Sequence, residues 1–534
     1  MFQFTSQYLT ETLKQAGGVA IYISEFLSQF YVVFWTGPII SALLLTLVAL
    51  LSSLILKKIN SRNDLPLIFL LPWLSLLIIS LDYDYYEQGT IAYLFLLLFL
   101  WLYTNIKTRI KFIYGICIIP ILYGIAGPIV HLFAISALFF EFLTNGKKKY
   151  ISIIYLLIAA LSAIAGTYLG YSRNLTLAFL PEAYCNPLQT VSGIYYAWYA
   201  LPMTMLLVAY LKRYKEPVSL KGKCIWEGAQ WAIMFLLVYQ GIFHFGKLDA
   251  QHSMKQDYLL RTEQWDLVIS EFIHDVLSKR RMCGLNLALA HKGQLSERLL
   301  DYPQHGIETL MLHWDQSIYT AQLHSDLYYC MGIISAAQKF AFEAFVSSRS
   351  SGNPRMLKRL IETNLITGSY PIADKYIQLL EKTWFYKDWA TAHRRFLYND
   401  KAVEEDKILG MKRRCWKAEA SAAKLYTDPV SSLINLLPAC PDNKAGLAYL
   451  TSFLLLNKDI ETYKTLQESL YRSPAWRDMT ECQQEAIVIC SPNDPHFWLE
   501  HGVSIKVRNR AIAFMQKVQD ISRSCLLYTS DAAD

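Results

Sequence analysis

An acidic stretch rich in tyrosine, DYDYYEQG, covers residues 82–89 and follows a long apolar run. Carboxylates beside aromatic faces suit a sugar, with a carboxylate to accept a proton, or a divalent cation bound through oxygen. The same composition is typical of an interfacial belt of tyrosines with solvated acids, and we favour the belt. The candidate residues are Asp82 and Asp84 for catalysis and Tyr83, Tyr85, Tyr86 and Glu87 for substrate binding.

Three further ionisable residues stand near or inside apolar segments. Glu11 and Glu25 are the only acids before the first apolar run, and both are catalytic candidates. His131 lies inside an apolar run, where an ionisable group is costly and often functional, so it is a candidate for lining a substrate cavity; a structural histidine is the favoured alternative. The two histidines and the aspartate of HFGKLDAQH, residues 244–252, have no metal-ligand spacing, so we predict no metal site and no cofactor.

The recurrent catalytic signatures are absent from the sequence. It contains no Gly-rich phosphate loop, no HExxH, no CxxC pair and no GxSxG elbow. The ten cysteines have no regular spacing, which favours buried free thiols over a disulfide framework. The sequence therefore leaves open whether the protein is an enzyme.

The composition divides the chain into two parts. Hydrophobic residues make up 53% and charged residues 18% of the 534 residues, but residues 31–246 hold long uncharged runs while residues 247–524 have the balanced charge of a soluble helical protein. The net charge of +7 lies mostly in short loops between apolar runs, with no basic stripe carrying interleaved aromatics. We therefore predict contact with a lipid bilayer and no nucleic-acid partner.

Eight apolar runs are long enough to cross a bilayer, since about 20 residues span it and segments of 15 to 17 can do so with help from neighbours. The division between the fourth and fifth runs depends on Gly127 and Pro128 alone, and a re-entrant pair is the alternative there. The predicted spans are residues 32–56, 65–81, 90–104, 112–126, 128–143, 151–170, 193–211 and 226–246.

Basic loops predict the orientation of these spans, because Lys and Arg are retained on the cytoplasmic side. Alternate loops are basic, so residues 82–89 and residues 247–524 fall on the outer side, which is the periplasm of a bacterial inner-membrane protein. Residue 1 also falls outside without a signal peptide, which predicts a preceding span missing from this sequence. The basic residues are Lys57, Lys58 and Arg62; Lys107, Arg109 and Lys111; Lys147, Lys148 and Lys149; and Lys212, Arg213, Lys215, Lys221 and Lys223.

The first 31 residues contain an amphipathic helix in VAIYISEFLSQF, residues 19–30. Its apolar residues recur at helical spacing, with serine, glutamate and glutamine on the opposite face. We predict surface helices in an outer loop, either packed on the bundle as a cover, which we favour, or lying on the membrane as a platform for a lipid substrate.

The second part of the chain has helix-length segments alternating with tight turns. The stretches 285–302, 361–380 and 449–470 each read as a helix, a tight turn and an amphipathic helix, and they resemble degenerate tetratricopeptide-type hairpins. The fold class is therefore all-α: a transmembrane helix bundle followed by a helical repeat domain in two parts, residues 247–400 and 401–524.

The closing stretch CLLYTSDAAD, residues 525–534, resembles the translation of a common sequencing adaptor. We predict that it is no part of the native protein.

The whole chain resembles a bacterial family of uncharacterised multi-spanning membrane proteins with a domain of unknown function, through GGVAIYISEFLSQFYVVFWTGP at residues 17–38 and NLALAHKGQLSERLLDYP at residues 286–303. In architecture it is more loosely similar to the GT-C class of membrane glycosyltransferases, which implies a polyprenyl-linked sugar donor and a catalytic acid in the first outer loop. Only Glu11 and Glu25 are available there, with no acidic pair.

Two function classes follow from these observations. In the favoured one, the bundle anchors a helical array that binds an envelope protein or peptide on its concave face. In the alternative, the bundle transfers a sugar from a lipid carrier. A transporter is a third and less favoured class, because the spans hold few paired charges.

Overall fold

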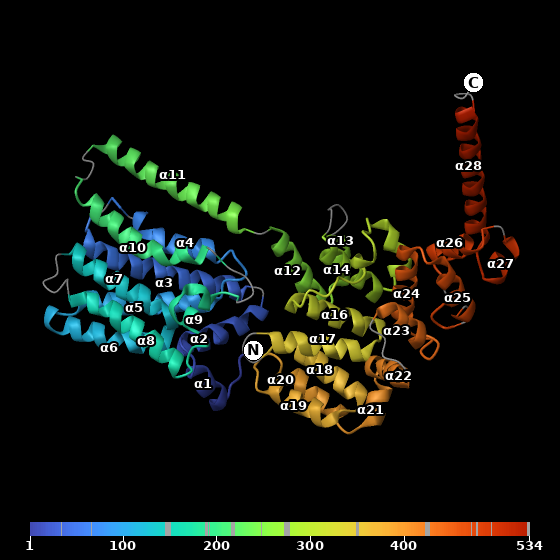
Figure 1. Cartoon of the computed structure of the whole chain (residues 1–534), viewed down its shortest axis with the longest axis horizontal. Coiled ribbons are helices and arrows are strands. Elements are labelled where there is room, and N and C mark those ends of the chain that lie inside the picture. The colour runs from blue at the N-terminus through green and yellow to red at the C-terminus, as the bar shows by residue number, and fades with distance from the viewer. Residues whose placement is uncertain are drawn as a thin grey trace. The chain divides into compact units, whose positions relative to one another are not determined.

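The computed structural model describes the chain as two helical units (Figure 1). One unit, Phe2–Leu248, is called the N-terminal unit below, and the other, Asp249–Asp534 with Met1, the C-terminal unit. No strand occurs among the described residues, where the single β-bridge joins Tyr85 to Cys185, so the predicted all-α class is confirmed. The described residues are 1–33, 35–62, 64–65, 67–144, 151–186, 191, 193–214, 219–246, 248–271, 278–348, 352–421, 428–470, 473–476, 479–492 and 494–530.

Parts of three predictions fall outside these residues. The predicted basic loop at residues 147–149 is not described, and neither are Lys215 of the last predicted basic loop and residues 531–534 of the predicted foreign tail. Of residues 520–530 only the helical backbone is described.

In the N-terminal unit a helix lies over each of the eight apolar runs. The elements are α1 Ser6–Leu13, α2 Gly18–Ser28, η1 Gln29–Val32, α3 Thr36–Ile59, η2 Ile68–Leu70, α4 Leu71–Ile79, α5 Glu87–Asn105, α6 Thr108–Ala126, η3 Gly127–Ile129, α7 Val130–Leu143, η4 Ile151–Ile153, α8 Ile154–Tyr168, α9 Leu175–Phe179, η5 Pro181–Tyr184, α10 Gly193–Leu211 and α11 Leu220–Phe245.

Four helical segments of the described chain are long and apolar enough to cross a membrane. They are Thr36–Ile59, Glu87–Asn105, Ile110–Leu143 and Gly193–Leu211. The count becomes five if Leu220–Phe245 and Asp249–Arg261 are taken together as one broken span, and Ile68–Ile79 and Ile154–Tyr168 are shorter apolar helices. These helices indicate a membrane protein.

Helix α3 has the surface of a helix that faces lipid. A stripe of large apolar side chains along one side, Ile39, Leu43, Leu47, Leu50 and Leu54, is between 45 and 61% exposed. The opposite side is buried against the bundle. A helix that is apolar on both its buried and its exposed faces is stable in a bilayer, whose hydrocarbon core takes the place of water around the outer face.

The 34-residue segment Ile110–Leu143 folds back on itself. Gly127 has a positive φ of 81°, and Pro128 follows it in the short helix η3. Beyond this turn α7 returns along α6, so that the Lys111 ammonium near the start of α6 lies 2.5 Å from the Glu141 carboxylate near the end of α7. The segment is therefore a helical hairpin rather than one straight helix.

Hydrogen bonds show which helix ends lie together in the bundle. At the end where the predicted cytoplasmic loops begin, Lys58 donates to Asn105 Oδ1 at 2.5 Å, and Asn60 donates to the carbonyl of Val208 at 3.1 Å. The carboxyl ends of α3, α5 and α10 therefore share one side of the unit. Since α3 and α5 run in parallel, the chain between them, which contains α4, runs back to the other side.

Helices α1 and α2 pack on the bundle through a close backbone approach at Gly17. Gly17 has a φ of 75°, and a Cβ there would lie 3.0 Å from the carbonyl carbon of Ala126 at the end of α6. Tyr184 supports the same turn, because its hydroxyl donates to the Ala126 carbonyl at 2.5 Å and accepts the Ile129 amide at 3.1 Å. Helix α2 then packs against α5 and α6.

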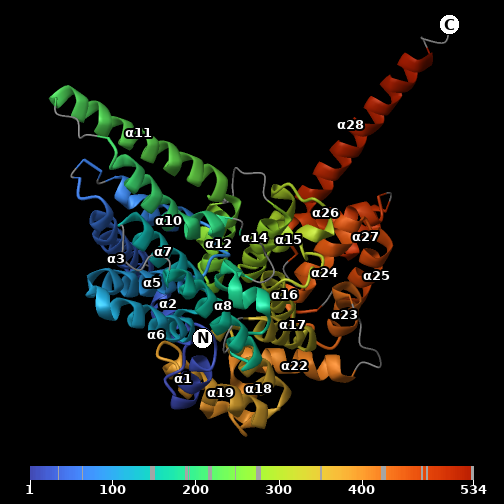
Figure 2. The ribbon, with the colours of Figure 1, turned by 60° about the vertical axis from the view of Figure 1, so that its left-hand side comes forward.

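The C-terminal unit is built from helices that pack on their neighbours in chain order, most extensively α16 on α17, α17 on α18, and α18 on α19 (Figures 1 and 2). Its elements are α12 Leu248–Arg261, α13 Trp265–Ser270, α14 Lys279–His291, α15 Leu295–Arg298, η6 Leu299–Asp301, η7 Ile307–Thr309, α16 Ile318–Met331, α17 Ile334–Ser347, α18 Pro354–Thr367, α19 Tyr370–Glu381, α20 Lys387–His393, η8 Arg394–Phe396, α21 Asp400–Glu405, α22 Lys407–Ser421, α23 Pro429–Leu436, α24 Lys444–Asn457, α25 Ile460–Leu470, α26 Glu481–Cys490, α27 Pro495–Glu500 and α28 Ile505–Ser530.

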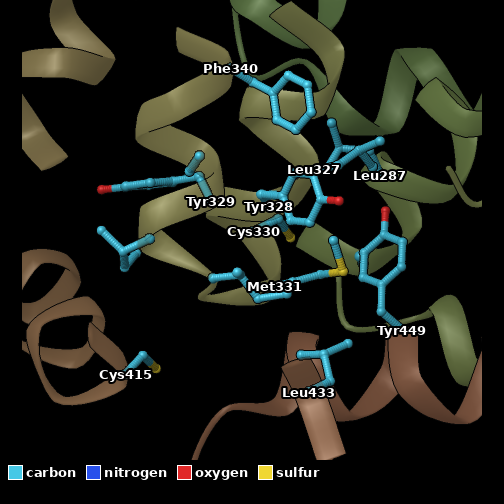
Figure 3. Close-up of a cluster of buried hydrophobic side chains, with 14 of the residues drawn as sticks. Leu287, Leu327, Tyr328, Tyr329, Cys330, Met331, Phe340, Cys415, Leu433 and Tyr449 are labelled. Atoms are coloured by element: carbon cyan, nitrogen blue, oxygen red, sulfur yellow. The ribbon is translucent and has the colours of Figure 1, made fainter. Parts of the chain in front are cut away.

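The core of this unit centres on the end of α16. Leu327, Cys330 and Met331 project from α16 into a cluster that also holds Leu433 of α23 and Tyr449 of α24 (Figure 3). The helix thus joins the earlier and later parts of the unit in one continuous core.

One type of turn recurs through the C-terminal unit. In each case a residue with positive φ follows the end of a helix. The backbone amide of the next residue then donates a hydrogen bond to the carbonyl of the residue five positions before its own. The first four such residues are Glu263, Gly293, Gly332 and Gly368, which are 30, 39 and 36 residues apart. Two later ones are Lys458 and Gly502. The three predicted hairpin stretches contain Gly293, Gly368 and Lys458, and each forms a helix, a tight turn and a second helix.

Candidate functional site

The predicted acidic loop after α4 is held by its own carboxylates. Asp82 is only 6% exposed, and its Oδ1 accepts the backbone amide of Asp84 at 3.0 Å. Asp84 receives two hydrogen bonds from Asn186, one from the backbone amide to its carbonyl at 2.8 Å and one from the side-chain amide to its Oδ1 at 3.0 Å. Asp82 therefore shapes the loop from within, and Asp84 fastens the loop to the segment before α10.

The tyrosines of this loop take different positions. Tyr85 is partly buried, with its hydroxyl 3.2 Å from Thr90 Oγ1, and its ring packs so closely on Gly89 that a Cβ there would lie 2.6 Å from the hydroxyl. The Tyr86 amide donates to the carbonyl of Tyr184 at 2.9 Å. Tyr83 is the exposed one, at 41%.

A short polar chain connects the surface helices to this loop. The hydroxyl of Tyr31, in η1, lies 3.4 Å from Ser41 Oγ, which donates to Glu87 Oε1 at 3.3 Å. The segment after α2 and the beginnings of α3 and α5 therefore meet at one place. It is the place at which the sequence predicts an outer-surface site.

Among the described residues, no hydrogen bond joins Glu11 or His131 to that place. Glu11 is exposed on α1 and accepts a hydrogen bond from Gln7 at 2.9 Å, while Glu25 is half-buried on α2. His131 stacks on Phe179, with ring centroids 4.8 Å apart, and its Nε2 is buried without a hydrogen-bond partner among the described residues.

An apolar cavity of about 610 Å³ runs between α4, α10 and α11 in the N-terminal unit. Polar side chains in its wall are few, among them Thr204, Gln240 and His244, and none of the four candidate acids lines it. Its apolar wall is made by Leu71, Leu74, Ile78, Ile79, Met203, Leu207, Leu237 and Phe245. Such a wall suits a hydrocarbon chain.

The C-terminal unit contains an ion-pair network that the sequence analysis missed. Asp326 of α16 pairs with two arginines of α18, Arg355 at 2.5 Å and Arg359 at 3.0 Å. Arg355 also pairs with Asp257 of α12 at 2.7 Å, and Arg359 with Glu362 at 2.8 Å. The network thus fastens three helices together, while the arginine side chains remain 18% exposed.

Aromatic rings and further cations extend this network into a surface. The Arg359 guanidinium lies 3.5 Å from the centre of the Tyr329 ring, and the Lys358 ammonium lies 4.8 Å from the ring of Trp389 and 5.2 Å from that of Tyr386. Seven of these side chains are partly exposed, and the Tyr329 ring beneath them is buried. We call the following set the Arg–aromatic surface: Asp326, Tyr329, Arg355, Lys358, Arg359, Glu362, Tyr386 and Trp389.

Charge and burial set the protonation of Asp326 and of His291, a histidine of α14 on which the charges of Asp326 and Arg359 also act. Burial opposes ionisation of Asp326, but the charges of Arg355 and Arg359 outweigh it and lower the pKa of this carboxyl. The ring of His291 stacks on Trp265, with centroids 4.1 Å apart. Burial on that side, helped by the positive charges of Lys412 and Arg359, lowers the pKa of His291 to about 4.

Part of this surface could have been predicted from the spacing of residues in the sequence. Arg355, Arg359 and Glu362 are four and three residues apart, which places them on one face of a helix. Their partner Asp326 lies on another helix, 29 residues before Arg355, and no local pattern connects the two. Among the residues that the structure describes, no group of three or more His, Cys, Asp or Glu side chains could hold a metal ion.

The apolar helices and the attached helical unit together define an all-α membrane protein. The chain belongs to the family described as "Family of unknown function (DUF6057)", whose model matches residues 1–526. No curated protein and no solved structure matches it.

Proposed function

We propose that this protein is an interaction scaffold of the bacterial cell envelope. In this proposal the N-terminal unit anchors the chain in the inner membrane, and the C-terminal unit is a periplasmic, tetratricopeptide-like array that binds a protein or peptide. The turns at 30-, 39- and 36-residue intervals support the array, because tetratricopeptide hairpins repeat about every 34 residues.

The observation that carries the proposal is the Arg–aromatic surface. It draws side chains from α16, α18 and α20 and the loop before α20, so that one extended partner could contact several successive helices. Arginine, tryptophan and tyrosine are the side chains that contribute most to protein interfaces, because they combine large contact area with hydrogen bonding. Two aromatic–histidine stacks, Trp265 on His291 and Trp389 on His393, provide further rigid rings in the unit.

Site-specific photo-cross-linking in living cells tests the scaffold. A benzophenone amino acid in place of Trp389 should give an adduct of discrete mass. The adduct should fall at least fivefold when Lys358→Glu reverses the neighbouring charge. The matched control is Lys375→Glu, the same change on an exposed position of α19 outside the surface. The proposal would be rejected if the Lys358→Glu and Lys375→Glu variants gave equal amounts of adduct, or if the benzophenone at position 389 gave no adduct.

A second candidate function is sugar transfer from a polyprenyl carrier in the manner of GT-C enzymes. The apolar cavity favours it, because its wall suits an isoprenoid chain, and α4, which forms part of that wall, leads directly into the loop of Asp82 and Asp84. The Tyr31–Ser41–Glu87 contact favours it as well, since it joins the surface helices to that loop.

The two candidates separate by substitution in the N-terminal unit. For the enzyme, at least one of Glu11→Gln, Glu25→Gln, Asp82→Asn, Asp84→Asn and Glu87→Gln should abolish envelope glycan transfer at a normal protein level. If all five retain transfer, or if only those that lower the protein level lose it, the sugar-transfer candidate is wrong.

A further inference from the structure

Helix α11 is fastened to the rest of the N-terminal unit near both of its ends. Near its start, the indole of Trp226 and the side-chain amide of Gln230 both donate to the carbonyl of Asp64, at 3.0 and 2.8 Å. Near its end, the ring of Phe245 packs so closely on Gly193 of α10 that a Cβ on Gly193 would lie 2.5 Å from a ring carbon. Between these ends α11 packs mainly on α4. The apolar cavity of about 610 Å³ lies in the space that this packing leaves between α10 and α11.

This cavity has the form of a groove, with α4 as its floor and one face each of α10 and α11 as its walls. The lining residues of α10 extend from Gly193 to Leu207, so the groove follows that helix for about 20 Å. Both rims are exposed, because Met203 on α10 is 64% exposed and Leu237 on α11 is 36% exposed. The groove therefore opens sideways, along the length of the helices. We call it the α10–α11 groove.

The position of the α10–α11 groove puts it within the hydrocarbon core of a bilayer. Helix α10, Gly193–Leu211, is one of the helices long and apolar enough to cross a membrane. The hydrocarbon core is about 30 Å thick, so the lipid chains of one leaflet take up about 15 Å of it. A groove of about 20 Å is thus long enough for one chain of one leaflet. Left unfilled, it would deprive its apolar walls of van der Waals partners.

Polar side chains of the groove gather toward one of its ends. Tyr196 lies near the start of α10, and Gln240 and His244 lie near the end of α11. The phenol, the amide and the imidazole can each donate a hydrogen bond. No Asp or Glu lines the cavity within the part of the chain that the structure describes. Because donors are present and carboxylates are not, this end suits an anionic group such as a phosphate.

We propose that the α10–α11 groove binds one phospholipid. One acyl chain lies along α10 on the floor formed by α4, and the phosphate lies at the end marked by Tyr196, Gln240 and His244. The bound chain fills the space between α10 and α11 and so holds the middle of α11 on the bundle. The lipid belongs to the leaflet at which α10 begins and α11 ends, which is the outer leaflet in the predicted topology. This site is independent of the scaffold function, since it needs no contact with a protein partner.

Native mass spectrometry of the full-length chain, purified from its membranes in a mild detergent, tests the site. We expect one phospholipid per chain to survive repeated detergent washing. Ala200→Trp, at a lining position of α10, fills the groove and should lower the lipid-bound fraction at least fivefold. The matched control is Ala232→Trp, the same change on an exposed position of α11 outside the groove, which should leave the fraction unchanged. His244→Leu, which keeps an apolar side chain in the wall but removes the donor, should lower the fraction at least threefold.

The mass of the bound lipid decides which occupant the groove takes. A phospholipid mass that Ala200→Trp removes supports the proposal. A polyprenyl phosphate would overturn it and would favour the sugar-transfer candidate instead. If the wild-type chain retains no lipid, or if Ala200→Trp retains as much as the wild type, the groove holds only the exchanging lipid of the surrounding bilayer and the proposal is wrong.

Photolabelling of the wild-type chain keeps the test valid if a variant fails to accumulate. Membranes that contain the protein receive a trace of phospholipid with a diazirine in the middle of one acyl chain, and the labelled residues are mapped after irradiation. Label should be at least fivefold more frequent at Met203 and Leu237, on the rims of the groove, than at Leu157 and Leu161 of α8, which are 62 and 63% exposed outside it. Equal labelling of the two sets would overturn the proposal.

Discussion

Asp326 is the carboxylate on which the Arg–aromatic surface depends. It is 13% exposed and balances Arg355 and Arg359, which would otherwise lie partly buried without enough counter-charge. We expect Asp326→Asn to lower the free energy of unfolding by about 2 to 3 kcal/mol, somewhat less than for a fully buried pair. Urea unfolding of the detergent-solubilised chain measures the loss.

The matched control for this substitution is an exposed ion pair of the same unit. Asp266 pairs with Lys292 at 3.0 Å, but its side chain is 81% exposed. Because water screens such a pair, Asp266→Asn should change the free energy of unfolding by less than about 0.5 kcal/mol. Equal losses at both positions would show that the Asp326 network does not stabilise the unit.

His291 predicts a pH dependence of stability in the acid range. Its pKa is lowered to about 4 in the folded chain, by burial first and then by Lys412, against about 6.5 when unfolded. Between these two pH values the unfolded chain therefore binds more protons than the folded chain. The contribution of neutral His291 to the free energy of unfolding is complete above pH 6.5 and is lost as the pH falls toward 4. Because His291 as a whole is exposed and only its packed side is shielded from water, the loss should be much smaller than full burial would give.

Thermal unfolding at pH 7 and pH 4.5 checks this prediction. The fall in Tm between the two values should be smaller in His291→Gln than in the wild type. His496→Gln, at a histidine whose side chain is 81% exposed, should leave the fall unchanged. Asp326 affects stability in a separate pH range. Because its pKa is lowered in the folded chain, its contribution to the free energy of unfolding is lost only below about pH 4.

Among the elements, the recurring turn offers a matched pair of substitutions. Gly368 has a φ of 77°, and no atom lies within 4 Å of the position that a Cβ would take there, so Gly368→Ala tests the backbone conformation alone. Lys458 occupies the same position of its turn with a φ of 57°. We expect Gly368→Ala to cost about 1 kcal/mol and Lys458→Gly to gain about 0.5 to 1 kcal/mol, because only glycine adopts this conformation without penalty.

Chemical unfolding of the two variants gives the comparison. Opposite signs would support a common left-handed turn at residues 368 and 458. A loss in both variants would show instead that the lysine side chain stabilises its turn more than the backbone strain costs.

For the molecule as a whole, the side of the membrane on which the C-terminal unit lies is the decisive prediction. The polar contacts of Lys58 and Asn60 bring several helix ends to one side of the N-terminal unit, and the predicted cytoplasmic loops begin there. With the positive-inside rule, we predict from this that the C-terminal unit lies in the periplasm. With exposed Cys117 and Cys224 replaced by serine, Lys375→Cys should react with an impermeant maleimide in intact cells.

The control uses the other side of the membrane. Lys57→Cys, at an exposed position near the end of α3, should react only after lysis. If the two reporters behave in the reverse way, the orientation is wrong and the scaffold would face the cytoplasm.

Local patterns in the sequence were enough to place most helices. The eight apolar runs each carry a helix, and the stretches around Gly293, Gly368 and Lys458 each form a hairpin. The turn at Gly127 and Pro128 was also visible, because proline and a glycine with positive φ interrupt an apolar run. Such features depend on neighbouring residues, whose periodicity and turn preferences are recorded directly in the order of the chain.

The pairings that could form a site depend instead on packing between distant segments. Asp84 meets Asn186, and Asp326 meets Arg359. The sequence indicated that 82–89 was polar and aromatic, but not that Asp82 would be buried in holding the loop. No spacing rule relates these partners, because each contact arises only after hydrophobic burial has brought whole helices together and fixed which faces touch.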